Sequence, residues 1–459
     1  MTHDANKPTA TATGAVAASG AGGRRHARVA ARTVIRSARR CGAGACLAVV
    51  VGLVGAGGAV AVDDPSDGGL WYFSATGMDA IHQTTQGKGI TIAVLDSQVN
   101  PAAPDLAGAD ITVHEPSYCA ATPGGPALPA ASTDVTAVHA TGMDGVILGT
   151  RVGVNGRPGQ RGIAPQASIR NYTTTYERGE IPMCESPAEL AGKSGMASAI
   201  DQAVADGADI ISMSISGRDD AQAFDAIGRA LHAGVILVAA GPHGSGTTMK
   251  FPASANGVVA VESADPSFAL TPETTTSPLL TVVAPGEHFL VVNDDWVSYV
   301  TASGSSNATA YTSAALALVW SAFPTATANQ VLQSLVRNTD GTDHALQRDD
   351  SWGYGVVNVR QMLSHDPTAY PDINPLLRAD GKPSTAQILG DGTTAPTTDA
   401  ATGAGTGGST ASGARPGVSS ALLVGGGIVL VVVLLIAAGV VVALVVGRRR
   451  RIGPGVPER

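Results

Sequence analysis

Charged residues are scarce in this sequence and make up 14% of its 459 residues, against about 25% in a typical soluble protein. Neither the four cysteines nor the ten histidines have the spacing of a zinc site. The formal net charge at pH 7 is −8, and the sequence has no lysine- and arginine-rich patch of the kind that binds nucleic acid. We therefore expect no nucleic-acid partner, no bound metal and no cofactor.

Basic residues gather at the N-terminus, where residues 1–40 contain Asp4 as their only acid. An apolar stretch follows from Cys41 to Val62, and the small residues Ala59-Val60-Ala61 lie at its end. This order is typical of a secretory signal, here over residues 1–61. Because the apolar run exceeds the usual ~7–15 residues, an uncleaved signal-anchor is the alternative. In either case we expect the following domain to be exported.

A second apolar stretch, residues 421–446, contains no charged side chain and is followed by four arginines, Arg448–Arg451. At ~1.5 Å per residue, a helix of this length exceeds the ~30 Å hydrocarbon core of a bilayer. We expect a single transmembrane helix here rather than a buried core helix. The positive-inside rule then places residues 447–459 in the cytoplasm.

Between the exported domain and this span, residues 371–420 are rich in threonine, alanine, glycine and serine, which is typical of a flexible linker. The expected organisation is an extracytoplasmic domain of residues 62–370, tethered to the cell membrane by one helix.

Two cysteines, Cys41 and Cys46, fall in the signal region, which leaves Cys119 and Cys184 in the exported domain. Two cysteines in an oxidising compartment favour a single disulfide. Two unpaired buried thiols are the alternative.

Within the domain, helical patterns alternate with short apolar strands, and glycine turns separate them. The expected strands are Ile90–Leu95, Ile210–Ile215 and Val235–Ala240, and the expected helices include those marked by Met143 to Ile147, Met196 to Val204, and Phe224 to Leu231. This alternation predicts an α/β fold, with a mostly parallel sheet and helices on both faces. In such sheets, sites gather at the carboxyl ends of strands, where Asp96 and Gly241 lie.

The stretch Ser303–Trp320 runs from glycine and small hydroxyl residues into a long series of alanine, leucine and valine, which predicts a buried helix. A serine at the start of such a helix has two interpretations. It can cap the helix, which is the commoner role, or it can act as a nucleophile beside the unpaired N–H groups of the first turn.

Asp96, His139 and Ser306 occur in the order aspartate, histidine, serine, which is the order of the subtilisin triad. The segments that carry the resemblance are Ile92–Val99, His139–Gly149, Gly162–Ala167, Ile210–Gly217, Val235–Gly241, Ala284–Gly286 and Gly304–Ala310. On these motifs the chain resembles the subtilisin-like serine proteases, or subtilases, over nearly all of Trp71–Leu363. With its signal, linker and terminal span, it is most similar to the mycosins, the membrane-anchored subtilases of type VII secretion.

The resemblance implies a serine endopeptidase that cleaves peptide or protein substrates and has type VII secretion components as partners. Ser306 would attack the carbonyl, His139 would transfer the proton, and Asp96 would orient His139. The backbone N–H of Ser306 would bind the oxyanion, while Ser214 and Gly217 would line the substrate cleft.

Several positions depart from the family pattern: Gln98 and Ala140 replace glycines, Asp144 replaces a small residue, Ala310 replaces proline, and Pro242 replaces the oxyanion asparagine. Proline has no donor, and loss of this donor costs about 10²–10³ in kcat, a value measured on a member of the family. Two hypotheses follow: a slow exported protease, or a degenerate subtilase that serves as a non-catalytic component of a secretion complex.

Overall fold

The computed structural model describes residues 68–390, apart from 179–180, 183, 243, 245, 247 and 342–343. The signal region (1–61), the linker from residue 391 onward, the predicted span (421–446) and the tail (447–459) lie outside the described residues. Within the described part, no helix is both long and apolar enough to cross a membrane.

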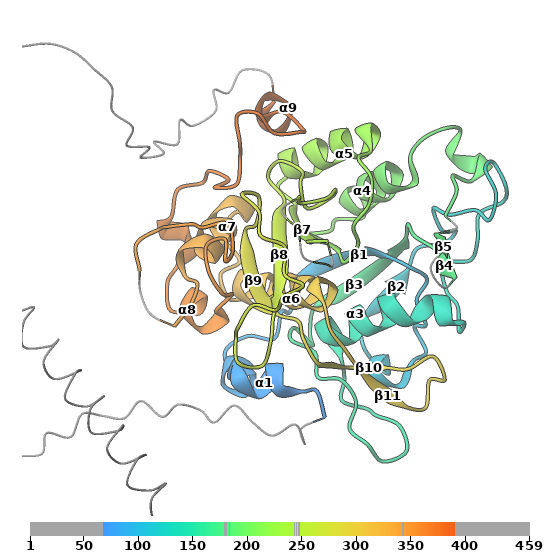
Figure 1. Ribbon diagram of the computed structural model, residues 1–459, viewed down its shortest axis with the longest axis horizontal. Coiled ribbons are helices and arrows are strands. Elements are labelled where there is room, and N and C mark those ends of the chain that lie inside the picture. Colours follow the sequence, from blue (N-terminus) through green and yellow to red (C-terminus); the bar gives the residue numbers. More distant parts are fainter. Residues whose placement is uncertain are drawn as a thin grey trace, which may run out of the picture. The chain divides into compact units, whose positions relative to one another are not determined.

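The centre of the fold is a seven-stranded sheet in the order β2-β3-β1-β6-β7-β8-β9, in which all pairs are parallel (Figure 1). Its strands are β1 (Thr91–Asp96), β2 (Ile111–Val113), β3 (Ser168–Thr173), β6 (Ile210–Met213), β7 (Ile236–Ala240), β8 (Val259–Ala264) and β9 (Val282–Pro285). The predicted parallel α/β fold is therefore confirmed. The strand predicted over Ile210–Ile215 ends earlier, at Met213, because the chain leaves the sheet there to line a cavity.

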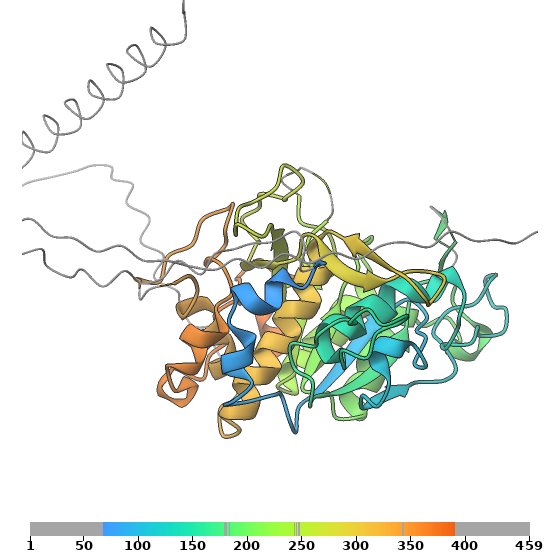
Figure 2. The ribbon, with the colours of Figure 1, turned by 90° about the horizontal axis from the view of Figure 1, so that it is seen from below.

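Helices cover both faces of this sheet, as its alternating side chains show. Ile92 and Val94 of β1 pack in one core with α3 (Val138–Leu148) and α6 (Ser305–Ala322). Ala93 and Leu95 pack in the other core, with α4 (Gly195–Ala205) and α5 (Ala221–His232). Figures 1 and 2 show these two layers. The glycine stops after α4 and α5 are as predicted, since Gly207 and Gly234 have φ of 80° and 81°.

Shorter elements complete the domain. They are α1 (Trp71–Ala75), α2 (Met78–Ile81), η2 (Pro104–Leu106), η3 (Val135–Ala137), β4 (Glu177–Arg178), β5 (Ile181–Pro182), η4 (Ala188–Leu190), β10 (Phe289–Val292), β11 (Tyr299–Ala302), α7 (Ala328–Arg337), α8 (Val359–Leu363), η5 (Pro367–Ala369) and α9 (Thr385–Leu389). β10 and β11 form an antiparallel hairpin. A disulfide joins Cys119 to Cys184, with Cα atoms 4.7 Å apart.

The folded domain extends beyond residue 370, where we expected the linker to begin. Asn256 donates to the carbonyls of Arg378 and Pro383 at 3.0 Å each, and Gln387 of α9 donates to Asp225 of α5 at 3.0 Å. Residues 371–390 therefore pack on the domain.

The predicted buried helix is α6, and most of its side chains, including Leu316 and Leu318, are fully buried. Two of its polar side chains are satisfied within the helix: Thr309 and Thr312 each donate to the carbonyl four residues earlier at 2.8 Å. Gly304 is the N-cap residue and makes no side-chain cap. Ser306 lies inside the first turn, so the N-cap interpretation of this serine is wrong.

Candidate active site

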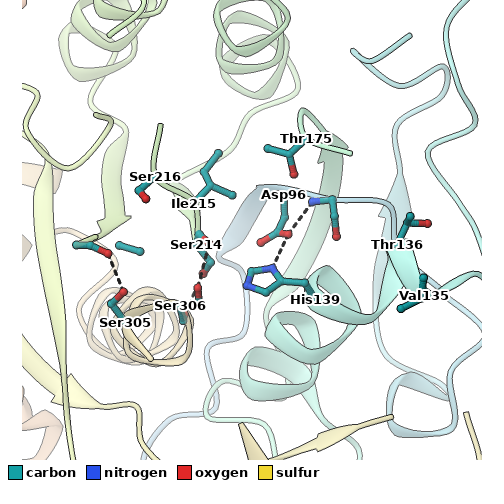
Figure 3. A pocket seen from close by; sticks show the side chains of 13 residues that line it. Asp96, Val135, Thr136, His139, Thr175, Ser214, Ile215, Ser216, Ser305 and Ser306 are labelled. Atoms are coloured by element: carbon teal, nitrogen blue, oxygen red, sulfur yellow. Dashed lines mark hydrogen bonds and ion pairs between the residues drawn. The ribbon is translucent and has the colours of Figure 1, made fainter. Parts of the chain in front are cut away.

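Asp96, His139 and Ser306 line one cavity of about 420 Å³ (Figure 3). Asp96 is the last residue of β1, His139 is in the first turn of α3, and Ser306 is in the first turn of α6. Three elements far apart in the sequence therefore bring together the three residues that the order of motifs suggested.

Asp96 and His139 form a direct pair. The Nδ1 atom of His139 lies 2.7 Å from Oδ1 of Asp96, and the N–H of Ser97 donates to the same oxygen at 2.6 Å. The carboxylate is 1% exposed and the imidazole 45%. A buried carboxylate that accepts from Nδ1–H fixes the ring tautomer, so the basic lone pair lies on Nε2.

Ser306 is paired with Ser214. The Oγ of Ser306 donates to the carbonyl of Ser214 at 3.1 Å, and the Oγ of Ser214 donates to the carbonyl of Ser306 at 2.9 Å. Proton transfer to His139 therefore requires the Ser306 hydroxyl to turn away from Ser214. Ser214 lines the cavity as expected, whereas Gly217 follows the lining segment and donates its N–H to the carbonyl of Phe251 at 2.7 Å.

The residues expected to form the oxyanion region lie in the first turn of α6 and directly after β7. Ser305 Oγ donates to the carbonyl of Gly241 at 2.8 Å, which fixes the two segments together. Pro242 is buried, and its carbonyl accepts from Thr275 Oγ1 at 3.0 Å. Because proline has neither an N–H nor a donor side chain, this position supplies no hydrogen bond to an oxyanion. The neighbouring His243 lies outside the described residues.

A buried glutamate lies behind this region. Glu262 of β8 is 2% exposed, and its Oε1 atom would lie 2.1 Å from a Cβ added to Gly241. Burial raises the pKa of Glu262 to about 8, so the carboxyl is protonated at neutral pH. We did not predict this residue, although an acid inside the apolar run VVAVESA was a usable signal.

The structure accounts for the departures at positions 98 and 144. Gln98 donates to the carbonyl of Pro129 at 2.7 Å and accepts from Thr136 at 2.6 Å. Asp144 is completely buried and accepts from Asn171 Nδ2 at 3.2 Å. Burial holds the pKa of Asp144 well above its ordinary value, which the Asn171 hydrogen bond partly offsets and the nearby charge of Asp96 reinforces.

A hydroxyl, an imidazole and a carboxylate in this arrangement suit acyl transfer. Among residues 68–390 as described, no group of three or more histidine, cysteine, aspartate or glutamate side chains is placed to hold a metal ion.

Comparison with known proteins identifies a family. A family model described as the Subtilase family matches residues 87–355. The chain is 28% identical over 279 residues to the minor extracellular protease Epr of Bacillus subtilis. The aligned residues cover 60% of this chain and 38% of Epr. It is also 28% identical over 280 residues to a thermostable alkaline protease of Halalkalibacterium halodurans. This alignment covers 60% of this chain and 67% of that protease.

Solved structures share the fold. MycP1 from Mycobacterium smegmatis has a TM-score of 0.51 at 19% identity, covering 67% of this chain and 86% of MycP1. The prenylagaramide maturation protease PagA has a TM-score of 0.50 at 23% identity, covering 63% of this chain and 98% of PagA.

Proposed function

The chain belongs to the subtilase family of subtilisin-like serine proteases, and on this premise we propose that it is a membrane-anchored extracytoplasmic endopeptidase with Asp96, His139 and Ser306 as its triad. The observation that carries the proposal is the 2.7 Å pair between His139 and Asp96 in the cavity that Ser306 also lines. The substrate is a peptide or protein.

In the proposed reaction, His139 Nε2 takes the proton of Ser306 as Oγ attacks the scissile carbonyl carbon. The carbonyl oxygen becomes an oxyanion beside the first turn of α6, where the Ser306 N–H and the helix dipole stabilise it. His139 then returns the proton to the leaving amine as the carbon–nitrogen bond breaks, and water releases the acyl group by the reverse sequence. Asp96 stabilises the imidazolium that forms twice in this cycle.

Pro242 sets the expected rate. With the side-chain donor missing, the oxyanion depends on backbone donors, so turnover should be about 10²–10³ slower than with an asparagine at this position. The missing donor at this position is also the observation that favours the second candidate function. In that function the protein is a degenerate subtilase that serves as a structural component of a secretion complex. The retained pair of Asp96 and His139 favours catalysis.

The location rests on sequence. The charge-free segment 421–446, followed by Arg448–Arg451, supports a single span with the C-terminus in the cytoplasm. Resemblance to the mycosins, together with the shared fold of MycP1, supports type VII secretion components as partners. Protease accessibility on intact cells tests the topology, since the domain should be digested from outside and a tag placed after residue 459 should be protected.

Incubation of the full chain with a complex peptide library, read by mass spectrometry, tests the activity. We expect new peptide ends that are absent with Ser306→Ala. If the same ends appear with that variant, Ser306 is not the nucleophile. If neither protein produces new ends, the non-catalytic function is favoured.

A further inference from the structure

Asp144 and Asn171 form a buried polar pair behind the candidate triad. Asp144 lies on α3 and Asn171 on β3, and the two residues are 0% and 1% exposed. Asn171 Nδ2 donates to Asp144 Oδ1 at 3.2 Å. The other oxygen of each group, Asp144 Oδ2 and Asn171 Oδ1, is buried and has no hydrogen-bond partner among the described residues.

If Asp144 is ionised, both atoms are acceptors and neither can satisfy the other. Leaving a buried polar atom unpaired is costly. A carboxyl and a primary amide are planar groups that can share two antiparallel hydrogen bonds, and one of the two is already present here. A proton on Asp144 Oδ2 would supply the second by donation to Asn171 Oδ1.

We propose that Asp144 is a neutral carboxylic acid held in a two-bond ring with the amide of Asn171, so that Asp96 alone of the two neighbouring carboxyl groups carries a charge beside His139. In this assignment Asp144 is a positioning residue. It joins the helix that carries His139 to the strand next to β1, and it adds no second negative charge to the site.

The sheet register places Asn171 close to Asp96 along the strands. Asn171 pairs with Val94 of β1, and Asp96 pairs with Thr173, two residues further along. The charge of Asp96 therefore acts on Asp144 through space, and together with burial it raises the pKa of Asp144.

Other titratable groups near the pair do not hold Asp144 ionised. The titratable side chains on β3 and on the elements that pack against α3, apart from Asp96, are Asp105, Arg170, Tyr172 and Tyr311. The carboxyl of Asp105 accepts from the hydroxyl of Tyr299, and burial raises the pKa of both Tyr172 and Tyr311, so they stay neutral. Arg170 is adjacent to Asn171 on the strand, so its side chain alternates to the other face.

The stability of Asp144→Asn tests the ring, because an amide at this position can make the same two hydrogen bonds without titrating. Relative to wild type, the unfolding constant of the variant should be similar at about pH 4. Above that pH, folding of the variant should become progressively more favourable than folding of wild type, by up to tenfold per pH unit until Asp144 ionises in the fold, since only unfolded wild type releases the proton. The measurement is denaturant unfolding of the full chain in mild detergent across pH 4 to 8.

Asp219, which is exposed, provides the matched control, and Asp219→Asn should show no such pH dependence. A variant Asp144→Asn that is less stable than wild type at pH 7, with a difference that does not grow with pH, would overturn the proposal.

Infrared spectroscopy of the wild-type chain provides a test that does not depend on how Asp144→Asn folds. At pH 7 we expect the carbonyl stretching band of a protonated carboxylic acid that moves to higher frequency in Asn171→Leu, because the amide partner is lost. Glu262→Gln removes the band of Glu262, the other carboxyl assigned above as protonated at neutral pH, and separates the two signals. A band unaffected by Asn171→Leu contradicts the ring.

The effect of Asp144 on His139 rests on the proposed function, so a separate measurement tests it. An ionised Asp144 would raise the pKa of His139. Labelling of Ser306 by a fluorophosphonate should therefore have the same pH midpoint in wild type and Asp144→Asn, and a lower midpoint in the variant would show that Asp144 is charged. Absence of labelling would defeat the proposed function while the stability and infrared results still decide the ring.

Discussion

Gln98 accepts a hydrogen bond from the hydroxyl of Thr136 at 2.6 Å, and this contact joins the turn after β1 to η3. Both side chains are buried, and both flank the site: Gln98 follows Asp96 by two residues, and Thr136 precedes His139 by three. Gln98 also donates to Pro129 in the loop between β2 and η3. The residue that replaces a family glycine thus holds together the segments that carry the acid and the base.

Replacing Gln98 with alanine should lower both stability and activity. Thr136 would lose its buried partner, which costs about 1–3 kcal/mol, and η3 would be less firmly held before His139. We expect a lower Tm and a lower kcat/KM. The exposed Gln166 is the control, because Gln166→Ala should stay within about 0.5 kcal/mol of wild type. Equal effects of the two substitutions would show that the Thr136 contact is unimportant.

Restoring a donor at position 242 should raise turnover. Pro242→Asn should increase kcat by about 10²–10³ with a smaller change in KM, because the new hydrogen bond forms mainly in the transition state. Pro242→Ala is the matched control, since it removes the ring without adding a side-chain donor. If both variants have the same kcat, the oxyanion does not form beside this residue.

Glu262 should make stability depend on pH. Its pKa rises from 4.5 in the unfolded chain to about 8 in the fold, mainly through burial. Between these values the unfolded state releases a proton that the folded state keeps. The contribution of Glu262 to stability is therefore fully present below about pH 4.5 and is lost as pH rises to about 8. In this range the free energy of unfolding falls by about 1.4 kcal/mol per pH unit.

Glu262→Gln should remove the part of the pH dependence of stability that this proton causes. The variant should therefore be more stable than wild type at pH 8. Denaturant unfolding at several pH values measures this, with Glu273→Gln as the exposed control. An unchanged slope in Glu262→Gln would mean that the carboxyl ionises normally within the fold.

The disulfide should stabilise the domain by about 2–4 kcal/mol, because it closes a long loop between residues 65 apart in sequence. The double substitution Cys119→Ser with Cys184→Ser should lower the free energy of unfolding by that amount, and a reductant should destabilise wild type but leave the double variant unchanged. Sensitivity of the double variant to reductant would point to a different cause.

Local patterns predicted the parts of the fold and site that depend on nearby residues. The apolar run before Asp96 predicted a strand ending in an acid, and the buried stretch Ser303–Trp320 predicted α6. Motif order suggested Asp96, His139 and Ser306, and the fold brings them into one cavity. Each of these signals lies within a short segment of the chain.

Contacts between distant segments could not be read in this way. The sequence flagged Asp144 as a departure, but its partner Asn171 lies 27 residues away on another element. Similarly, only the pairing of β7 with β8 brings Glu262 opposite Gly241. The threonine, alanine, glycine and serine content of residues 371–420 suggested a linker. Residues 371–390 nevertheless pack on the domain, through the buried side chains of Leu376 and Ile388 and through the hydrogen bonds of Asn256.

Labelling of the full chain with a fluorophosphonate, followed by mass spectrometry of the labelled peptide, tests the central claim most directly. The reagent reacts with a serine that a neighbouring base activates, and it needs no knowledge of the substrate sequence. We predict slow modification of Ser306 that rises with pH as His139 loses its proton, that is lost in Ser306→Ala, and that is strongly reduced in His139→Ala. Absence of label on Ser306 in folded protein, or equal labelling after His139→Ala, would contradict the proposed triad.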